Sequence, residues 1–201
     1  MKKAFSLIEI IVALSIFVLL FLIIGGFFKG TFEQSRVIRE QINATYNAER
    51  ISNSIIKLIR ELRDGQDGSF PIYKADDFEL SFFADIDLDG DVEKVRFFLD
   101  QGVLKQGVID PQGFPPEYID SNEIIKKLAY YVVNTQSDPI FYYYNGNWPK
   151  DQIGNPLVTP ASRKDIKLIR INFLIDVDLS RIPVPSEVET VVYLRNLKDN
   201  Y

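Results

Sequence analysis

Residues 1–28 of the chain read MKKAFSLIEIIVALSIFVLLFLIIGGFF. Lys2 and Lys3 come first, and the apolar run that follows over residues 5–28 contains a single charged residue, Glu9. At a helical rise of about 1.5 Å per residue this run is about 36 Å long, which is enough to cross a membrane. Because positive charge precedes the run, we expect the N-terminus in the cytoplasm and the rest of the chain on the other side.

Glu9 is unusual because a carboxylate inside a membrane span is costly and needs a cationic partner. If the chain is cut after Ala4, Phe5 carries a new α-amino group four residues before Glu9. In a bundle of identical helices, Glu9 of one subunit would pair with this amine of its neighbour and set the stagger between them. The alternative is an ordinary signal anchor that makes no use of Glu9.

The residues around this junction resemble a known family. Residues 2–9, KKAFSLIE, are similar to the class III leader and methylation motif of type IV prepilins and type II secretion pseudopilins. The resemblance implies a leader at residues 1–4, cleavage between Ala4 and Phe5 by a prepilin peptidase, N-methylation of Phe5, and assembly through Glu9. It implies an inner-membrane location before assembly, and it implies the assembly platform and other pilin or pseudopilin subunits as partners. Gly is usual at the position of Ala4, and Ala there implies slower processing. The mid-helix proline of many major pilins is absent, which favours a minor pilin or pseudopilin.

Composition excludes several classes of chemistry. The chain has 201 residues, a net charge of −5, no cysteine and no histidine. Disulfides, thiolate chemistry, histidine acid–base catalysis and the usual zinc sites are therefore excluded. An acidic chain lacks the basic face that binds nucleic acid. We expect neither an enzyme nor a nucleic-acid-binding protein.

The stretch after the apolar run has the period of an amphipathic helix. Its apolar-face positions recur at spacings of three and four: Ile38, Ile42, Thr45, Ala48, Ile51, Ile55, Leu58 and Leu62. No proline interrupts residues 5–62, and Asp64-Gly65 supplies a stop. We expect one long helix over residues 5–64, with 5–28 in the membrane and 29–64 packed on a globular domain.

Beyond residue 70 the period changes to two, which predicts strands. We expect them at 78–84, 92–99, 103–108, 124–133, 139–144, 166–177 and 188–194; at 124–133 a helix is the alternative. Residues 110–117 and 147–164 are predicted loops. The fold class is therefore α+β, a long N-terminal helix packed on an antiparallel β domain at 70–201. Segments of this domain are similar, more weakly, to large minor pilins and J-type pseudopilins.

The segment DIDLDGDVE, residues 85–93, carries acids at alternate positions followed by Gly90. Asp85, Asp87 and Asp89 match the first half of a calcium loop, and Asp91 and Glu93 could complete a looser site. Arg96 stands where an EF-hand has its bidentate glutamate, which excludes a complete EF-hand. The alternative is a solvated acidic turn without an ion.

An aromatic group, Phe141 to Tyr144 with Trp148, is a candidate binding face for a sugar or a partner protein. Strand alternation would send Phe141 and Tyr143 to one side and Tyr142 and Tyr144 to the other, so that half of the group enters the core.

These features favour a structural minor subunit of a type IV filament system, located at the filament tip. The alternative is an extracytoplasmic binding module that stays permanently anchored in the membrane. Retention of residues 1–4 and indifference to Glu9 would distinguish the anchored module.

Overall fold

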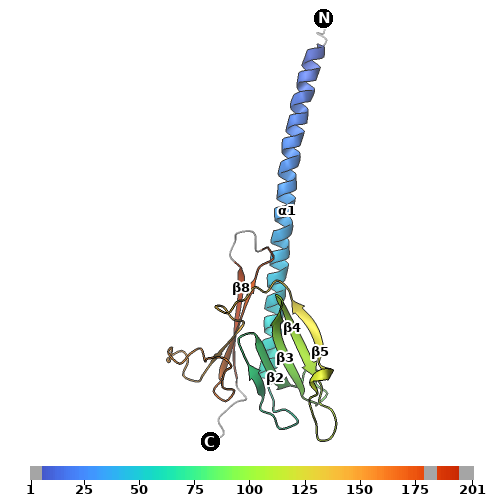
Figure 1. Ribbon diagram of the computed structural model, residues 1–201. Coiled ribbons are helices and arrows are strands. Elements are labelled where there is room, and N and C mark those ends of the chain that lie inside the picture. The colour runs from blue at the N-terminus through green and yellow to red at the C-terminus, as the bar shows by residue number, and fades with distance from the viewer. Residues whose placement is uncertain (1–5, 179–184, 195–201) are drawn as a thin grey trace. The chain divides into compact units, whose positions relative to one another are not determined.

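The computed structural model describes residues 6–178 and 185–194. Its class is α+β, as expected, with one long helix, α1 (Leu7–Arg60), followed by antiparallel strands in two sheets (Figure 1). The chain divides into two compact units, residues 1–40 and residues 41–201. The first unit is helical and contains the apolar segment. The second contains helix and strands that pack around a hydrophobic core.

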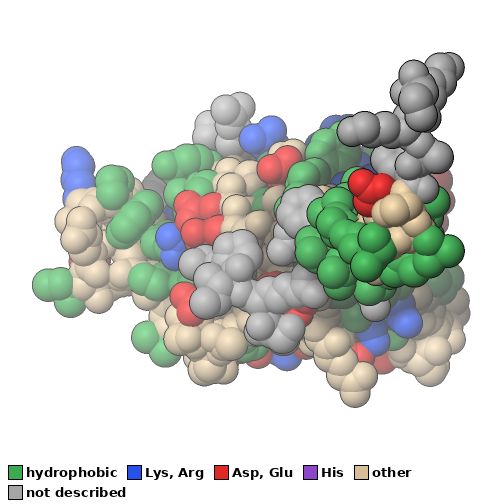
Figure 2. All heavy atoms as spheres, turned by 90° about the horizontal axis from the view of Figure 1, so that it is seen from above, with side chains coloured by type: hydrophobic (Ala, Val, Ile, Leu, Met, Phe, Trp, Pro, Cys, Tyr) green, Lys and Arg blue, Asp and Glu red, His purple; other side chains and the backbone are tan. Residues whose placement is uncertain are grey.

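The first unit is the N-terminal part of α1. Within the described residues, one helical segment is long and apolar enough to cross a membrane, Leu7–Gly26, with a mean hydropathy of 3.2 and none of it buried. Figure 2 looks toward this end of α1 and shows hydrophobic side chains gathered on it. Ser15, a polar residue in this segment, donates its hydroxyl to the carbonyl of Ile11 at 2.8 Å, so its hydrogen-bonding need is met within the helix.

The second unit begins with the remainder of α1, whose buried side chains follow helical spacing. They are Ala48, Ile51, Ser52, Ile55, Ile56 and Ile59. The expectation that Ile38 and Ile42 belong to the buried face is wrong, because their side chains are 58% and 61% exposed. The helix ends at Arg60 rather than at residue 64. It ends there because the backbone turns toward the sheet, where the amide of Arg63 donates to the carbonyl of Phe83 at 3.1 Å.

The larger sheet has five strands in the order β1-β2-β3-β4-β5, an antiparallel meander. The strands are β1 (Ile72–Ala75), β2 (Glu79–Ala84), β3 (Glu93–Asp100), β4 (Val103–Ile109) and β5 (Ile124–Ala129). The prediction missed β1, a segment of four residues. The segment at 124–133 is a strand and ends at Ala129; its Ile124 and Ile125 are exposed.

The smaller sheet has three strands in the order β6-β7-β8. They are β6 (Phe141–Tyr144), β7 (Leu168–Ile175) and β8 (Ser186–Tyr193). The central strand β7 is apolar on most positions, and Ile169, Ile171, Phe173 and Ile175 are fully buried. Side chains of both sheets and of α1 form one hydrophobic core.

Backbone hydrogen bonds link the β1 edge of the larger sheet to the smaller sheet and to the loop before β7. The amide of Phe141 donates to the carbonyl of Asp77 at 3.1 Å, and the amide of Ala161 donates to the carbonyl of Ala75 at 2.8 Å. The edge strand β1 and the turn after it therefore connect the meander to β6 and to the loop before β7. A 3-10 turn after β4, η1 (Asp120–Asn122), brings the carboxylate of Asp120 to Lys94 of β3.

Candidate functional site

The N-terminal turn of α1 is closed by two reciprocal hydrogen bonds. The amide of Ser6 donates to Oε2 of Glu9 at 2.8 Å, and the amide of Glu9 donates to Oγ of Ser6 at 3.3 Å. This is a capping box, which satisfies amides that have no partner within the helix. The Ser-x-x-Glu spacing was visible in the sequence, yet the role of Ser6 was missed. Ala4 and Phe5 lie outside the described residues.

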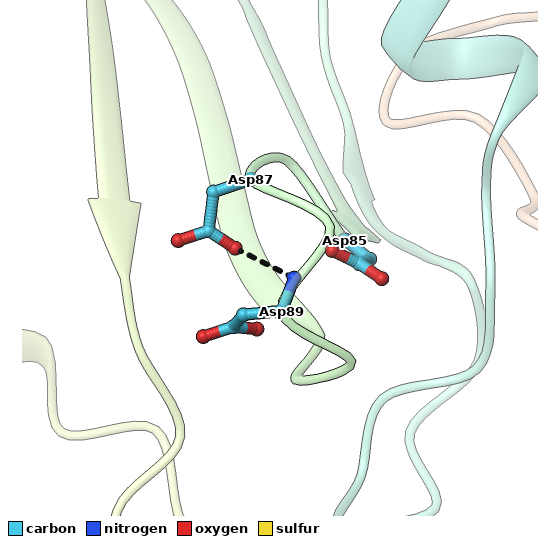
Figure 3. Close-up of side chains that lie close together, drawn as sticks. All are labelled: Asp85, Asp87 and Asp89. Carbon is cyan, nitrogen blue, oxygen red and sulfur yellow. Dashed lines mark hydrogen bonds between the residues drawn. The ribbon is translucent and has the colours of Figure 1, made fainter.

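The acidic loop between β2 and β3 brings three of its five predicted ligands together. One carboxylate oxygen from each of Asp85, Asp87 and Asp89 lies within 4.8 Å of the others (Figure 3). These carboxylates accept backbone amides further along the loop: Leu88 to Asp85 at 2.7 Å, Asp89 to Asp87 at 3.3 Å and Asp91 to Asp89 at 2.8 Å. Gly90, at a φ of 100°, makes the left-handed turn that the loop needs.

Asp91 and Glu93 make different contacts. Oδ1 of Asp91 accepts from Nε2 of Gln66 at 3.0 Å. Glu93 is 3% exposed, and its Oε2 accepts from the amide of Ile86 at 2.8 Å. Burial raises the pKa of Glu93, and the negative charges of Asp87 and Asp89 raise it further. Three carboxylates facing one another have the oxygen chemistry that calcium takes, so a calcium site at this loop stays a prediction.

The aromatic group follows the predicted alternation, with one change. Phe141 and Tyr143 are fully buried, and the hydroxyl of Tyr143 donates to the carbonyl of Asp76 at 2.8 Å. On the other side Tyr142 is half-buried beneath Arg170, whose guanidinium carbon lies 4.0 Å from the ring centroid. Tyr144, however, is also buried, because the ring of Trp148 packs on it at 4.7 Å. The open aromatic surface is smaller than the sequence suggested.

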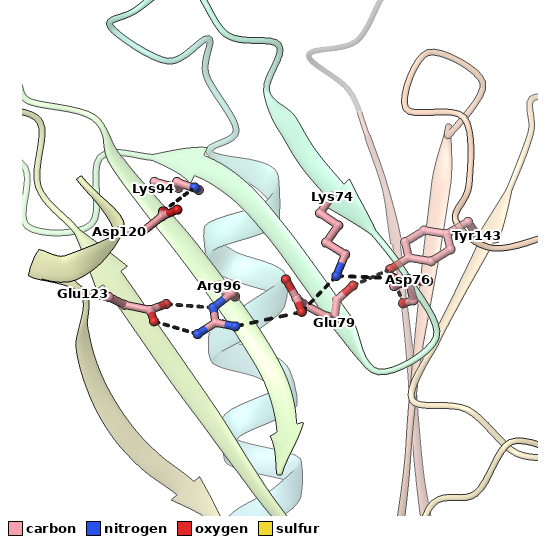
Figure 4. Close-up of polar contacts among 8 residues, drawn as sticks. All are labelled: Lys74, Asp76, Glu79, Lys94, Arg96, Asp120, Glu123 and Tyr143. Carbon is pink, nitrogen blue, oxygen red and sulfur yellow. Dashed lines mark hydrogen bonds and ion pairs between the residues drawn. The ribbon is translucent and has the colours of Figure 1, made fainter. Parts of the chain in front are cut away.

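A cavity of about 310 Å³ lies against β2 and β3 of the larger sheet. Its lining is charged and polar: Tyr73, Glu79, Ser81, Lys94, Arg96, Ile109, Asp120 and Glu123. Figure 4 shows its charged residues on the face of this sheet opposite α1. The prediction missed this site because Tyr73 comes from β1, which was not predicted. Asp120 and Glu123 come from η1 and from the residue after it. The only sequence signal was the alternation of polar residues along β2 and β3.

Ion pairs fill the walls of this cavity. Nε of Arg96 donates to Oε1 of Glu123 at 2.7 Å and Nη2 donates to Oε2 at 2.6 Å, a bidentate pair. Nζ of Lys94 donates to Oδ1 of Asp120 at 3.1 Å. The hydrogen bonds to Glu123 are the main cause that raises the pKa of Arg96, so the guanidinium stays charged over the physiological range.

Comparison with known proteins assigns no function to these sites. No protein-family model matches the chain, and no curated protein matches it.

Proposed function

We propose that this chain is a structural minor subunit, a minor pilin or pseudopilin, of a type IV filament system. The observation that carries the proposal is the N-terminal segment. It combines a basic start, the run Ala4-Phe5-Ser6-Leu7-Ile8-Glu9 and a single apolar helical span whose one carboxylate lies in the first turn of α1. In this function a prepilin peptidase cuts between Ala4 and Phe5, and Phe5 is N-methylated.

Glu9 has two successive partners in this proposal. In the membrane, its carboxylate accepts the amide of Ser6 within the capping box, where the positive end of the helix dipole also favours it. During assembly, the carboxylate pairs with the α-amino group of Phe5 on the neighbouring subunit. Beside Glu9, the small side chain of Ala13 leaves a shallow apolar hollow next to Leu14 and Phe17, which suits close packing of another apolar helix.

The subunit begins as a single-pass protein of the inner membrane, with its N-terminus in the cytoplasm and residues 41–201 outside. The assembly platform then extracts it into the filament beside other pilin or pseudopilin subunits. A folded unit of two sheets is large for a subunit repeated along a filament, which favours a place at the tip. The net charge of −5 favours a protein partner over a nucleic acid, because nucleic acid is itself negatively charged.

Two measurements on protein from the host membranes test the proposal. Intact-mass analysis should show a chain that starts at N-methylated Phe5. Glu9→Leu should be cleaved and should accumulate in the membrane, but it should be absent from sheared filaments, because the neighbour's amine would be buried unpaired.

Ser6→Ala is the matched control for Glu9→Leu, since it removes the capping box and keeps the carboxylate. It should still enter filaments. Wild-type protein that retains Met1, or Glu9→Leu that assembles as well as wild type, would overturn the proposal. An intact Met1 would instead support the second candidate, a permanently anchored binding module, which the charged cavity on the larger sheet favours.

A further inference from the structure

Ser81 is the most informative residue of the cavity on the larger sheet. Ser81 lies in the middle of β2 and lines the cavity, and only 1% of its surface is exposed. Among the described residues nothing donates to its Oγ or accepts from it. Buried hydroxyl groups nearly always have a partner, because an unpaired one loses its bonds to water and gains nothing in return. A hydroxyl of this kind, facing a cavity, indicates a polar ligand.

The neighbouring side chains retain hydrogen-bonding capacity beyond their ion pairs. Nη1 of Arg96 is 3.9 Å from Oε2 of Glu79, too far for a hydrogen bond, so its N–H groups are available to a ligand. Nζ of Lys94 makes one bond to Asp120 and lies 4.0 Å from the ring centroid of Tyr73. Carboxylate oxygens accept more than one hydrogen bond, so Glu79 and Glu123 can also take donors.

The site is held in place by the backbone of β4. A Cβ added to Gly107 would lie 1.9 Å from Oε1 of Glu123, which shows that the carboxylate lies directly on the strand. At position 107, only glycine leaves room for the Glu123 carboxylate in this position. Because Glu123 in turn holds Arg96 through two hydrogen bonds, the guanidinium is oriented before any ligand arrives.

The charge pattern decides the class of ligand. Two cations and three carboxylates line the cavity, and the cations are paired with carboxylates. A charged ligand would have to break these pairs, whereas a neutral hydroxyl group donates and accepts without breaking any. The half-exposed ring of Tyr73 and the side chain of Ile109 supply an apolar wall for C–H groups. The volume of about 310 Å³ is at the small end of the range for ligand pockets.

We propose that this cavity binds one neutral sugar unit, with Ser81 Oγ, Arg96 Nη1 and the carboxylate of Glu79 as hydrogen-bonding partners. None of these residues belongs to the N-terminal helical unit, and binding does not require filament assembly. Failure of one proposal therefore leaves the other standing.

The test is a titration of the full chain in a detergent without a sugar head group, such as dodecylphosphocholine. The probes are the methyl glycosides of glucose, galactose, mannose and N-acetylglucosamine, with glycine as a charged, zwitterionic comparison. The readout is the NMR signal of the Arg96 Nε–H group, which reports from inside the cavity. We expect at least one glycoside to shift this signal with a saturable curve.

Two variants locate the site. Ser81→Ala should bind at least about tenfold more weakly, because it removes a direct partner and leaves the fold in place. Tyr73→Ala, at an exposed wall position, should weaken binding independently. Ser162→Ala, an exposed serine on the loop before β7, should bind as wild type does.

Three outcomes would overturn the proposal. One is the lack of any glycoside-dependent shift up to about 100 mM, far above a millimolar dissociation constant. Another is unchanged binding by both Ser81→Ala and Tyr73→Ala. The third is a shift produced by glycine and by none of the glycosides, which would assign the cavity to a zwitterion.

Discussion

Glu93 carries a carboxyl group into the interior of the second unit, close to the exposed carboxylates of Asp87 and Asp89. Burial disfavours its charged form, so its pKa in the folded protein lies above the reference value of 4.5. Between these two pKa values the folded protein binds a proton that the unfolded chain has lost. The contribution of Glu93 to stability therefore falls as the pH rises through this window and is least favourable above it.

Glu93→Gln should remove the destabilising contribution of the buried, charged carboxylate. The amide oxygen can still accept from the amide of Ile86, and no charge is buried. In the presence of chelator, the variant should gain stability relative to wild type near pH 7 more than near pH 4, which lies below the pKa of the carboxyl group in both states. Guanidinium unfolding followed by the fluorescence of Trp148, the one tryptophan of the chain, measures this difference. A difference that is the same at both pH values would contradict the prediction, and the exposed Glu187→Gln is the control.

At the scale of elements, the connection between β2 and β3 is organised by its own acids. Asp85 is buried and also accepts from Nη1 of Arg63 at 3.2 Å, so one of its oxygens is already beside a cation. Leu88, at a φ of 66°, adopts a left-handed conformation that costs a leucine energy. A cation held by the three facing carboxylates would offset their repulsion and stabilise this turn.

Calcium should therefore raise the melting temperature of the full chain, and a chelator should reverse the rise. At about 100 times the dissociation constant the gain is about 2.7 kcal/mol, or roughly 5–10 °C for a chain of this size. Asp87→Asn should abolish the shift, whereas Asp110→Asn, an exposed residue after β4, should keep it. Equal melting temperatures with calcium and with chelator would remove the site.

The C-terminal part of α1 offers a second prediction at this scale, because two isoleucines on it differ in burial. Ile55 is fully buried in the core, and Ile42 is 61% exposed. Ile55→Ala should lower the free energy of unfolding by about 2–5 kcal/mol, since it removes buried methyl groups and leaves a cavity. Ile42→Ala should change it by no more than about 0.5 kcal/mol. Guanidinium unfolding measures both, and equal costs would show that the buried face is assigned wrongly.

For the whole molecule, the division into two units has a physical basis in burial. The hydrophobic core starts at Ala48 and draws on both sheets, whereas none of Leu7–Gly26 is buried. The apolar span is therefore suited to contacts with lipid or with other chains, and the second unit has a core of its own.

A chain that starts at Ser35 should fold and remain in the supernatant after ultracentrifugation, because it keeps the whole core and loses the apolar span. Its unfolding midpoint in guanidinium, followed by Trp148 fluorescence, should match that of the full chain in detergent. Sedimentation with membranes, or a midpoint clearly lower than that of the full chain, would contradict this independence. Full-length protein in the same membranes is the control for sedimentation.

Local patterns in the sequence were enough for the class of the fold and for most of its elements. The unbroken helical period and the absence of proline predicted α1, and alternation together with apolar, β-branched composition predicted seven of the eight strands. Alternation also predicted that Phe141 and Tyr143 share one side of their strand, and both are buried. The apolar run over residues 5–28 predicted the helical segment long and apolar enough to cross a membrane, Leu7–Gly26, because that property depends on length and composition. These features depend on neighbours in the chain, which a sequence displays directly.

Only the tertiary structure decided where distant residues meet. The four residues of β1 carry too little pattern to be recognised, and hydrogen bonds from β2 and from residue 161 make them a strand. The division into two sheets, the burial of Tyr144 under Trp148 and the hydrogen bond from Gln66 to Asp91 likewise depend on long-range packing. Ser81 is an ordinary strand serine in the sequence. It becomes a candidate ligand contact because β3, β4 and the segment at η1 remove it from water without giving it a partner.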